Sequence, residues 1–244
     1  MLEVSGVSKH FDGVFAVNDV TFSISKGSIT ALIGPNGAGK TTLFNVITGF
    51  LKPESGVIRM DGRSLNGSEP YEIAVAGLGR TFQNLRLIKG LSVMENVLLA
   101  FHEGGVFRSI LKALRGIRRE EETRKAAELL DFVGLAEKAG DPAGDLSYGQ
   151  QKLLSLACCL ALEPRLLLLD EPVAGVNQEM ILRILELLGK LRDRGIAVFM
   201  IEHNLDAVMK IAERLIVMDE GRIIADGLPA VVKEDPAVIE AYLE

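Results

Sequence analysis

The chain has 244 residues, of which 48% are apolar and 25% are charged, and this suits one large α/β domain with a smaller lobe. Its formal net charge of −6 argues against nucleic acid as the main partner. No apolar run reaches the roughly 18 residues that cross a bilayer, and the start Met1-Leu2-Glu3 has no signal-peptide pattern, so we expect a soluble, cytoplasmic chain. Cys158 and Cys159 are adjacent in an apolar segment, which indicates buried thiols and not a disulfide or a metal site.

Residues 1 to about 82 have the pattern of short strands joined by turns. Val20, Phe22 and Ile24 alternate with polar residues, which is typical of a strand with one buried face. The pair Asp61-Gly62 predicts a turn. The run from Ile29 to Ile33 is apolar enough to predict a buried strand.

A glycine-rich loop follows this buried strand and has the spacing of a phosphate-binding loop. Its glycines let backbone N–H groups point at phosphate oxygens where side chains would block the approach. A helix predicted from Lys40 to Ile47 would place its positive end on a β-phosphate. Lys40 would neutralise the β- and γ-phosphates, and Thr41 would offer its hydroxyl to Mg²⁺. The loop and the start of the helix consist of Gly34, Pro35, Asn36, Gly37, Ala38, Gly39, Lys40, Thr41 and Thr42.

From about residue 85 to 160 the pattern is helical. Ser92 and Glu95 form a capping-box pattern at the start of a helix that should end near Phe101. Two favourable i,i+4 pairs are predicted, Glu120 with Arg124 and Glu121 with Lys125. One amphipathic segment has an apolar face of Phe107, Ile110, Leu111 and Leu114 against a basic face of Arg108, Lys112, Arg115, Arg118 and Arg119. This pattern fits either a solvated helix face or a contact with lipid headgroups or a membrane subunit.

The end of this region and the strands after it contain polar residues at element ends. Ser147 can cap a helix predicted from Tyr148 to about Leu162, whose first N–H groups are otherwise free. The apolar run from Leu166 to Leu169 predicts a central parallel strand, and Asp170 and Glu171 follow it. Open α/β sheets bind ligands at such strand ends. Asp170 would therefore lie beside the metal, and Glu171 could accept a proton from an attacking water as general base.

The string Leu146-Ser147-Tyr148-Gly149-Gln150 resembles the signature motif of ATP-binding cassette (ABC) proteins, which is usually LSGGQ. The resemblance implies that this helix end contacts the γ-phosphate of ATP held by a second cassette subunit, so that two chains enclose two ATP molecules. Tyr148 replaces the usual glycine, and its side chain would crowd the nucleotide unless it points away. The site residues that the resemblance implies are Ser147, Tyr148, Gly149 and Gln150 in the signature motif, Gln83 as a catalytic, metal- and water-sensing glutamine, His203 as the switch histidine after the strand Ala197 to Ile201, Phe11 stacking on adenine with Ala16 nearby, and Asn177 where many cassettes have Asp.

Several stretches resemble the ATPases of bacterial branched-chain amino acid importers, and this similarity covers essentially the whole chain. They are LSYGQ, the run from Gly79 to Leu87, and the tail segments Asp226 to Pro229 and Asp235 to Leu243. The stretch from Phe101 to Arg119 is similar to the importer ATPase with a helical insertion. The resemblance implies ATP and Mg²⁺ as cofactors, a second ABC ATPase subunit and transmembrane permease subunits as partners, and indirectly an extracytoplasmic solute-binding protein. It also implies a cytoplasmic location, peripheral on the inner face of the membrane.

The expected fold is α/β, a P-loop NTPase core with a mixed sheet, an N-terminal antiparallel β-subdomain and an inserted helical subdomain. The core would comprise residues 1–84 and 161–244, and the helical subdomain residues 85–160. Alternatives within the class are an importer of urea, an amide or another polar solute, and a soluble cassette of DNA repair or translation. The long coiled-coil insertions and tandem cassettes of those soluble proteins are missing from this sequence. A regulatory cassette that binds ATP without turnover is a further alternative, and Glu171 and His203 argue against it.

Overall fold

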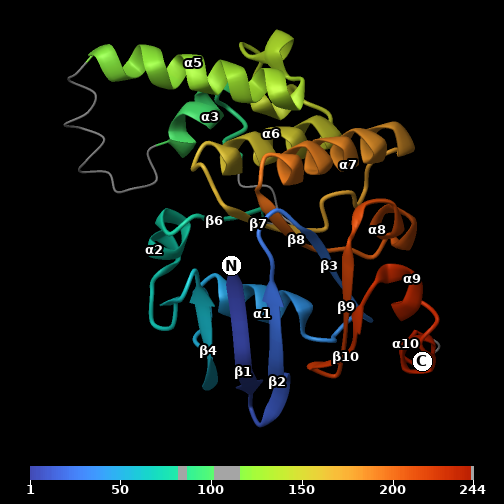
Figure 1. Ribbon diagram of the computed structural model, residues 1–244. Coiled ribbons are helices and arrows are strands. Elements are labelled where there is room, and N and C mark those ends of the chain that lie inside the picture. Colours follow the sequence, from blue (N-terminus) through green and yellow to red (C-terminus); the bar gives the residue numbers. More distant parts are fainter. Residues whose placement is uncertain (82–86, 102–115, 243–244) are drawn as a thin grey trace.

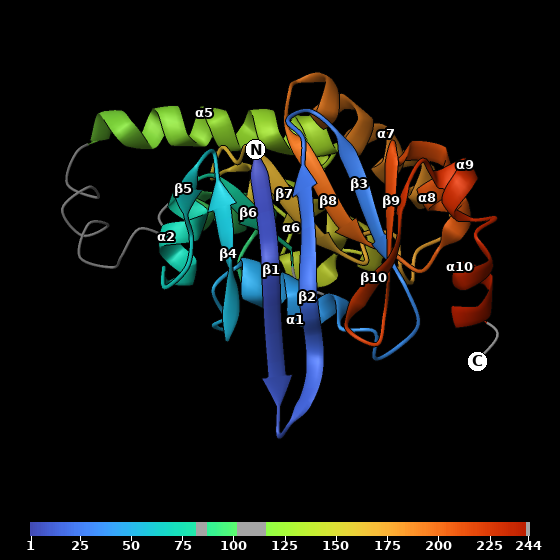
Figure 2. The same ribbon diagram turned by 60° about the horizontal axis from the view of Figure 1, so that its bottom comes forward.

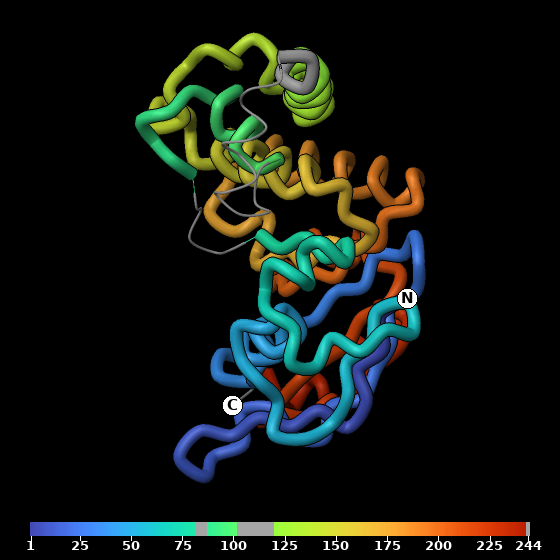
Figure 3. The backbone as a smooth tube through the Cα atoms, turned by 90° about the vertical axis from the view of Figure 1, so that its left-hand side faces the viewer, coloured from blue at the N-terminus to red at the C-terminus, as the bar shows by residue number. Residues whose placement is uncertain are grey.

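A computed structural model describes residues 1–81, 87–101 and 116–242 (Figure 1). A six-stranded mixed sheet lies in the middle of the molecule, a four-stranded antiparallel sheet lies on one side of it, and helices cover the other side. In the side view of Figure 3, helices from residues 93–160 form one end of the molecule and the N-terminal hairpin forms the other. The predicted fold class, α/β with a mixed sheet, an antiparallel part and inserted helices, is confirmed.

The antiparallel sheet has the strand order β2 (Val14–Ile24), β1 (Leu2–Phe11), β4 (Ser55–Met60) and β5 (Arg63–Ser64), and Figure 2 shows it face on. In β2, Val20, Phe22 and Ile24 are buried and the residues between them are exposed, as the alternation predicts. Asp61 and Gly62 both have positive φ, 49° and 80°, in the turn between β4 and β5. This turn is therefore also confirmed.

The central sheet has the strand order β10 (Arg222–Gly227), β9 (Arg214–Asp219), β3 (Ile29–Ile33), β8 (Ala197–Ile201), β7 (Leu166–Asp170) and β6 (Leu78–Arg80). Neighbouring strands are parallel except for the antiparallel pair β9 and β10. All five residues of each of the strands β3, β7 and β8 are buried, which explains why these strands are almost entirely apolar, with Thr30 and Asp170 as the polar exceptions. The carboxyl ends of these three strands lie at one edge of the sheet. There Ile201 of β8 is in register with Asp170 of β7 on one side and with Leu32 of β3 on the other.

The helices are placed on both faces of this sheet (Figure 1). The helix α1 spans Lys40–Ile47 as predicted, and its Phe44 packs against Phe199 of β8 with ring centroids 5.0 Å apart. The opposite face carries the larger helical core, in which α6 and α7 bury their apolar faces. The other helices are α2 (Pro70–Val75), α3 (Val93–Ala100), α5 (Gly116–Val133), α6 (Tyr148–Leu160), α7 (Gln178–Asp193), α8 (Leu205–Ile211), α9 (Pro229–Val232) and α10 (Pro236–Ala241), with short 3-10 turns at Ala136–Lys138 and Ala143–Asp145.

Some local predictions need correction. The helix α6 ends at Leu160, two residues earlier than predicted, and Arg124 pairs with Glu128, at 2.5 Å, and not with Glu120. The pair of Glu121 with Lys125 is present at 3.8 Å. The two cysteines were expected to be buried thiols, and each is a thiol that is half-buried and not fully buried. The amphipathic face predicted over 107–119 lies outside the residues whose side chains are described.

Over residues 1–81, 87–101 and 116–242, none of the helices combines the length and the apolar character needed to span a membrane.

Candidate functional site

The loop between β3 and α1 requires glycine at two positions because other backbone segments press against it. A Cβ on Gly34 would lie 2.0 Å from the carbonyl oxygen of Met218, and one on Gly39 would lie 1.9 Å from the carbonyl oxygen of Ala16. Both glycines also have φ in the left-handed region, 151° and 94°. The close approach to Gly39 places the backbone of Ala16 against the phosphate-binding loop, whereas the sequence reasoning expected Ala16 near Phe11 on the adenine side.

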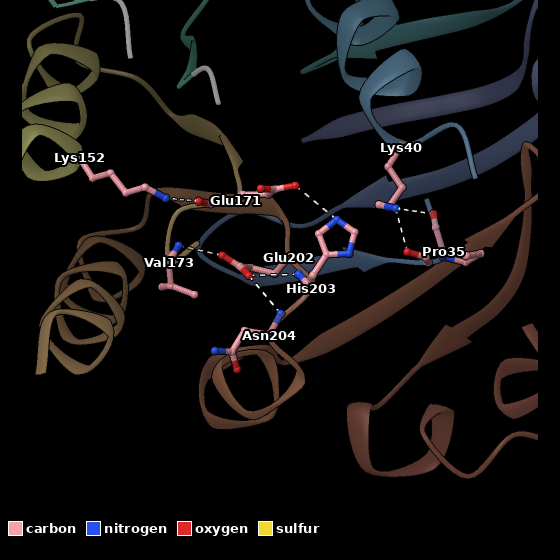
Figure 4. Close-up of polar contacts among 9 residues, drawn as sticks. Pro35, Lys40, Lys152, Glu171, Val173, Glu202, His203 and Asn204 are labelled. Carbon is pink, nitrogen blue, oxygen red and sulfur yellow. Dashed lines mark hydrogen bonds and ion pairs between the residues drawn. The ribbon is translucent and has the colours of Figure 1, made fainter. Parts of the chain in front are cut away.

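Lys40 begins α1 and turns its side chain back over the loop. Its Nζ donates hydrogen bonds to the carbonyl oxygens of Gly34 and Pro35, each at 2.8 Å (Figure 4). Burial lowers the pKa of the ammonium, and the negative charges of Glu171 and Asp170 oppose this effect. Two carbonyl oxygens of the loop thus hold the ammonium group, and phosphate oxygens could take their place. Thr41 is exposed and Thr42 half-buried in the same helical turn.

Asp170 ends β7 with a buried carboxylate. The Arg80 guanidinium Nη2 lies 3.6 Å from its Oδ2, and its backbone N–H donates to the hydroxyl of Thr81 at 3.3 Å. Burial raises the pKa of this carboxyl, and Arg80 acts in the opposite direction. The same guanidinium donates to Oδ1 of Asn45 and to the hydroxyl of Thr48, each at 2.8 Å, so Arg80 ties β6 and the end of α1 to this carboxylate.

Glu171 and His203 face one another across the ends of β7 and β8. The His203 Nε2 lies 3.3 Å from the Glu171 Oε1 (Figure 4). Glu171 has a φ of 51°, which is unusual for a residue with a side chain. A left-handed conformation at such a residue costs about 1–2 kcal/mol. Strain of this kind collects at functional sites, where the surrounding structure holds it in place.

The helix start at Ser147 forms the predicted cap. The Ser147 hydroxyl accepts a hydrogen bond from the Gln150 N–H at 3.3 Å, and the Gln150 side-chain oxygen accepts one from the Ser147 N–H at 3.0 Å. A Cβ on Gly149 would lie 2.9 Å from Cγ of Met180, so the helix start is packed closely against α7. This explains why glycine occupies the position after Tyr148.

Tyr148 lies over the loop that follows Glu171. A Cβ on Gly175 would be 3.1 Å from a ring carbon of Tyr148, and the Lys152 ammonium is 5.3 Å from the ring centroid. A cavity of about 230 Å³ is lined by both of these side chains together with Thr81, Asp170 and Glu171, among other residues. The tyrosine ring therefore fills space within its own chain, although 47% of the residue stays exposed.

Other predicted site residues have simpler surroundings. Asn177 caps α7, with its Oδ1 accepting a hydrogen bond from the Met180 N–H at 2.9 Å. Phe11 ends β1, 46% exposed, with the Lys9 ammonium 5.4 Å from its ring centroid. Asn36, Gly37 and Ala38 complete the loop, Asn36 and Gly37 being exposed and Ala38 buried. Gln83 lies outside the described residues.

Three residues at the site were missed by the sequence reasoning. Glu202 is a buried carboxylate between β8 and α8, and the Lys152 ammonium donates to the carbonyl oxygen of Glu171 at 2.5 Å. Tyr242, near the C-terminal end, is linked to the phosphate-binding loop by a hydrogen bond with the backbone of Gly34; burial raises the pKa of its hydroxyl, and this hydrogen bond acts in the opposite direction. A single acid, lysine or tyrosine in such positions gives no local signal, because its role depends on contacts far along the chain.

The glycine loop, its lysine, and the acids at the ends of parallel strands define a nucleotide-binding protein of the phosphate-loop class. The comparisons with known proteins give the family. A family described as ABC transporter matches residues 17–174, and one described as branched-chain amino acid ATP-binding cassette transporter matches residues 222–243. The chain belongs to the ABC transporter family and is an ATPase of that family.

The individual relatives agree with this over the whole chain. The high-affinity branched-chain amino acid transport ATP-binding protein BraF of Pseudomonas aeruginosa is 42% identical, over 100% of this chain and 97% of the relative. A solved ATP-binding cassette of an ABC transporter in its ADP conformation has a TM-score of 0.90 and 36% identity, over 100% of this chain and 98% of that one. A dimeric bacterial ABC transporter cassette has a TM-score of 0.80 and 27% identity, over 94% of this chain and 99% of that one.

Proposed function

We propose that this chain is the ATP-hydrolysing subunit of an importer for branched-chain amino acids. The observation that carries the solute class is the C-terminal tail, because residues 222–243 match the cassette family of branched-chain amino acid transporters. The name of BraF agrees with this assignment. The tail is also part of the site's surroundings, since its Tyr242 reaches the N–H of Gly34.

The geometry of the strand ends supports the catalytic assignment. Glu171 is the general base, because its carboxylate lies beside His203 and can accept a proton from water attacking the γ-phosphate. His203 contacts the γ-phosphate, and Lys40 exchanges its two carbonyl contacts for phosphate oxygens. Positioning and charge, more than covalent chemistry, account for catalysis in phosphoryl transfer.

The acids and hydroxyls at the site fit a magnesium ion. Asp170 carries a carboxylate whose pKa is raised mainly by burial, so a divalent cation beside it would offset the cost of its charge. Asp170, Thr41 and Gln83 are the residues that would hold Mg²⁺. When bound there, the ion would supply positive charge that offsets the negative charge of the ATP phosphates.

The complete site needs a second cassette. Ser147 and Tyr148 begin α6 on an exposed surface, and the related cassette named above is a dimer. We assign Ser147, Tyr148, Gly149, Gln150 and Asn177 to the face that meets the partner's ATP, and Phe11 and Ala16 to the adenine side. The helices of the predicted subdomain, residues 85–160, would transmit closure of the two cassettes to permease subunits at the inner face of the membrane.

Transport activity tests the proposal directly. The chain would be reconstituted in proteoliposomes with its partner ATPase, its permease subunits and its solute-binding protein. ATP-dependent uptake of labelled leucine or isoleucine is the expected result. Uptake of urea or an amide without uptake of leucine would assign the chain to a related importer. ATPase activity that no permease stimulates would favour a cassette without a transport role.

A further inference from the structure

Glu202 is the most completely buried acid at this edge of the sheet among the described residues, with 1% of its surface exposed. Its Oε1 accepts a hydrogen bond from the Val173 N–H at 2.8 Å, and its Oε2 accepts hydrogen bonds from the N–H groups of His203 at 3.1 Å and Asn204 at 3.3 Å (Figure 4). Val173 stands two residues after Glu171. One carboxylate therefore joins the loop that carries the base to the loop that carries the histidine.

Lys152 provides a second contact to the same loop from the signature helix α6. Its Nζ donates to the carbonyl oxygen of Glu171 at 2.5 Å (Figure 4). The lysine charge also interacts favourably with the charges of Glu202, Glu171 and Asp170. Lys152 stands five residues after Ser147, on the first turns of the helix that Ser147 caps. The position of α6 and the position of the Glu171 backbone are thus linked by one hydrogen bond.

These contacts lie where the backbone is strained. Glu171, with its φ of 51°, directly follows β7, and its N–H donates to the carbonyl oxygen of Ile201 at 3.0 Å. A conformation of this kind persists only where neighbouring contacts fix it. Lys152 fixes the chain at Glu171 itself and Glu202 fixes it two residues later at Val173, so the two residues hold the strained residue and the segment that follows it.

We propose that Glu202 and Lys152 are positioning residues that hold Glu171 and His203 face to face and couple this pair to the signature helix. The inference rests on the proposed role of Glu171 as general base. Neither residue contacts the reacting atoms in this arrangement: Glu202 acts through the backbone of two loops, and Lys152 acts through one carbonyl oxygen. Movement of α6 when the partner cassette engages would be transmitted to the base through Lys152.

Glu202→Gln is the sharpest test, because it keeps the shape and replaces one acceptor oxygen with an N–H donor. The side-chain NH₂ group of the glutamine would then face either the backbone N–H of Val173 or the backbone N–H groups of His203 and Asn204, so that two donors oppose each other. We expect the maximal ATPase rate to fall at least tenfold, about 1.4 kcal/mol in the barrier, while KM and the affinity for a fluorescent ATP analogue stay within twofold. The matched control is Glu186→Gln, since Glu186 is an exposed acid on α7 paired with Lys190, at 2.7 Å.

The lysine provides a second test in case Glu202→Gln does not fold. Lys152→Met removes the donor and should lower the maximal rate at least fivefold at unchanged ATP affinity. Lys152→Arg keeps a donor and should restore most of the activity, with Lys190→Met as the control for losing a lysine. A purely structural role would instead lower the melting temperature and the bound fraction of ATP together, and would not distinguish methionine from arginine by the maximal rate.

Glu171→Gln is measured in parallel to separate the role of Glu171 as general base from the positioning role of Glu202. An inactive Glu171→Gln beside a fully active, folded Glu202→Gln would overturn the positioning role and leave the base assignment intact. A Glu171→Gln variant with wild-type turnover would remove the base assignment and the inference with it. A Glu202→Gln variant whose loss lies wholly in KM would also overturn the inference.

Discussion

Gly39→Ala tests whether the close approach of the β2 backbone at Ala16 is the reason for glycine at position 39 of the phosphate-binding loop. A Cβ on Gly39 would lie 1.9 Å from the carbonyl oxygen of Ala16, whereas a Cβ on Gly37 would have nothing within 4 Å. The two glycines have similar φ values, 94° and 88°. Both substitutions therefore carry the cost of a left-handed alanine, about 1–2 kcal/mol. Only Gly39→Ala must also push β2 away from the loop.

The difference between the two variants is measurable without nucleotide. Overfilling a packed site adds about 1–3 kcal/mol, so Gly39→Ala should lower the free energy of unfolding by about 2–5 kcal/mol and Gly37→Ala by about 1–2 kcal/mol. In a chain of this length these losses correspond to about 4–20 °C and about 2–8 °C in Tm. Urea unfolding and calorimetry of both variants give the comparison. Equal losses would refute the contact of Ala16 with the loop as the reason for glycine at position 39.

Four further predictions concern the chemistry and the partner. Glu171→Gln should keep ATP binding and accumulate a closed dimer on gel filtration, since the amide has the carboxylate's shape without its basicity; turnover within a few-fold of wild type would contradict this. Ser147→Arg should abolish hydrolysis while the isolated chain binds ATP normally, whereas Lys40→Ala should weaken ATP binding itself by about 1.5–3 kcal/mol. Calorimetric titration measures both affinities, and a large loss of affinity in Ser147→Arg would count against the two-chain site. Burial is the main cause that raises the pKa of Glu202 above its ordinary value near 4.5. The stability of wild type relative to Glu202→Gln should therefore be greatest below that value and be lost as pH rises through the folded pKa. Urea unfolding from about pH 7 to about pH 5 measures this slope, and the opposite slope would mean that the three N–H donors and Lys152 outweigh desolvation. The chain alone should be mainly monomeric and slow, and its partner ATPase should raise specific activity about tenfold or more; full activity with no dependence on protein concentration would show that one chain completes the site.

The parts of the site that the sequence predicts correctly depend on local signals. The strands Ile29–Ile33 and Leu166–Asp170 are almost entirely apolar because each is buried on both faces. The helix starts at Lys40 and Ser147 follow from glycine spacing and from a capping pattern within four residues. The place of Asp170 beside the loop follows from the rule that parallel strands end at one edge.

The parts that the sequence does not predict depend on contacts between distant residues. Lys152 reaches Glu171 across 19 residues, and Val173 reaches Glu202 across 29. A glutamate after a strand and a lysine on a helix are ordinary surface residues by composition, and only the folded chain places them in one buried network. The same holds for the ring of Tyr148, which lies so close to Gly175 of the loop after β7 that a Cβ there would be 3.1 Å from a ring carbon.

Groups that are expected to meet ATP already have partners within the chain, and this limits what each can add to affinity. Lys40 donates to two carbonyl oxygens, Asp170 faces Arg80, and the Ser147 hydroxyl accepts from Gln150. ATP binding must therefore exchange existing contacts for new ones, and only the difference between them appears in the binding free energy. Because carbonyl oxygens are neutral and phosphates are charged, this exchange favours the nucleotide most strongly at Lys40. The Ser147 hydroxyl still has its own proton to donate, so it can keep its cap and contact the partner's phosphate at the same time. This asymmetry predicts that the loop lysine determines affinity within one chain, while the signature serine adds to the site only when two chains meet.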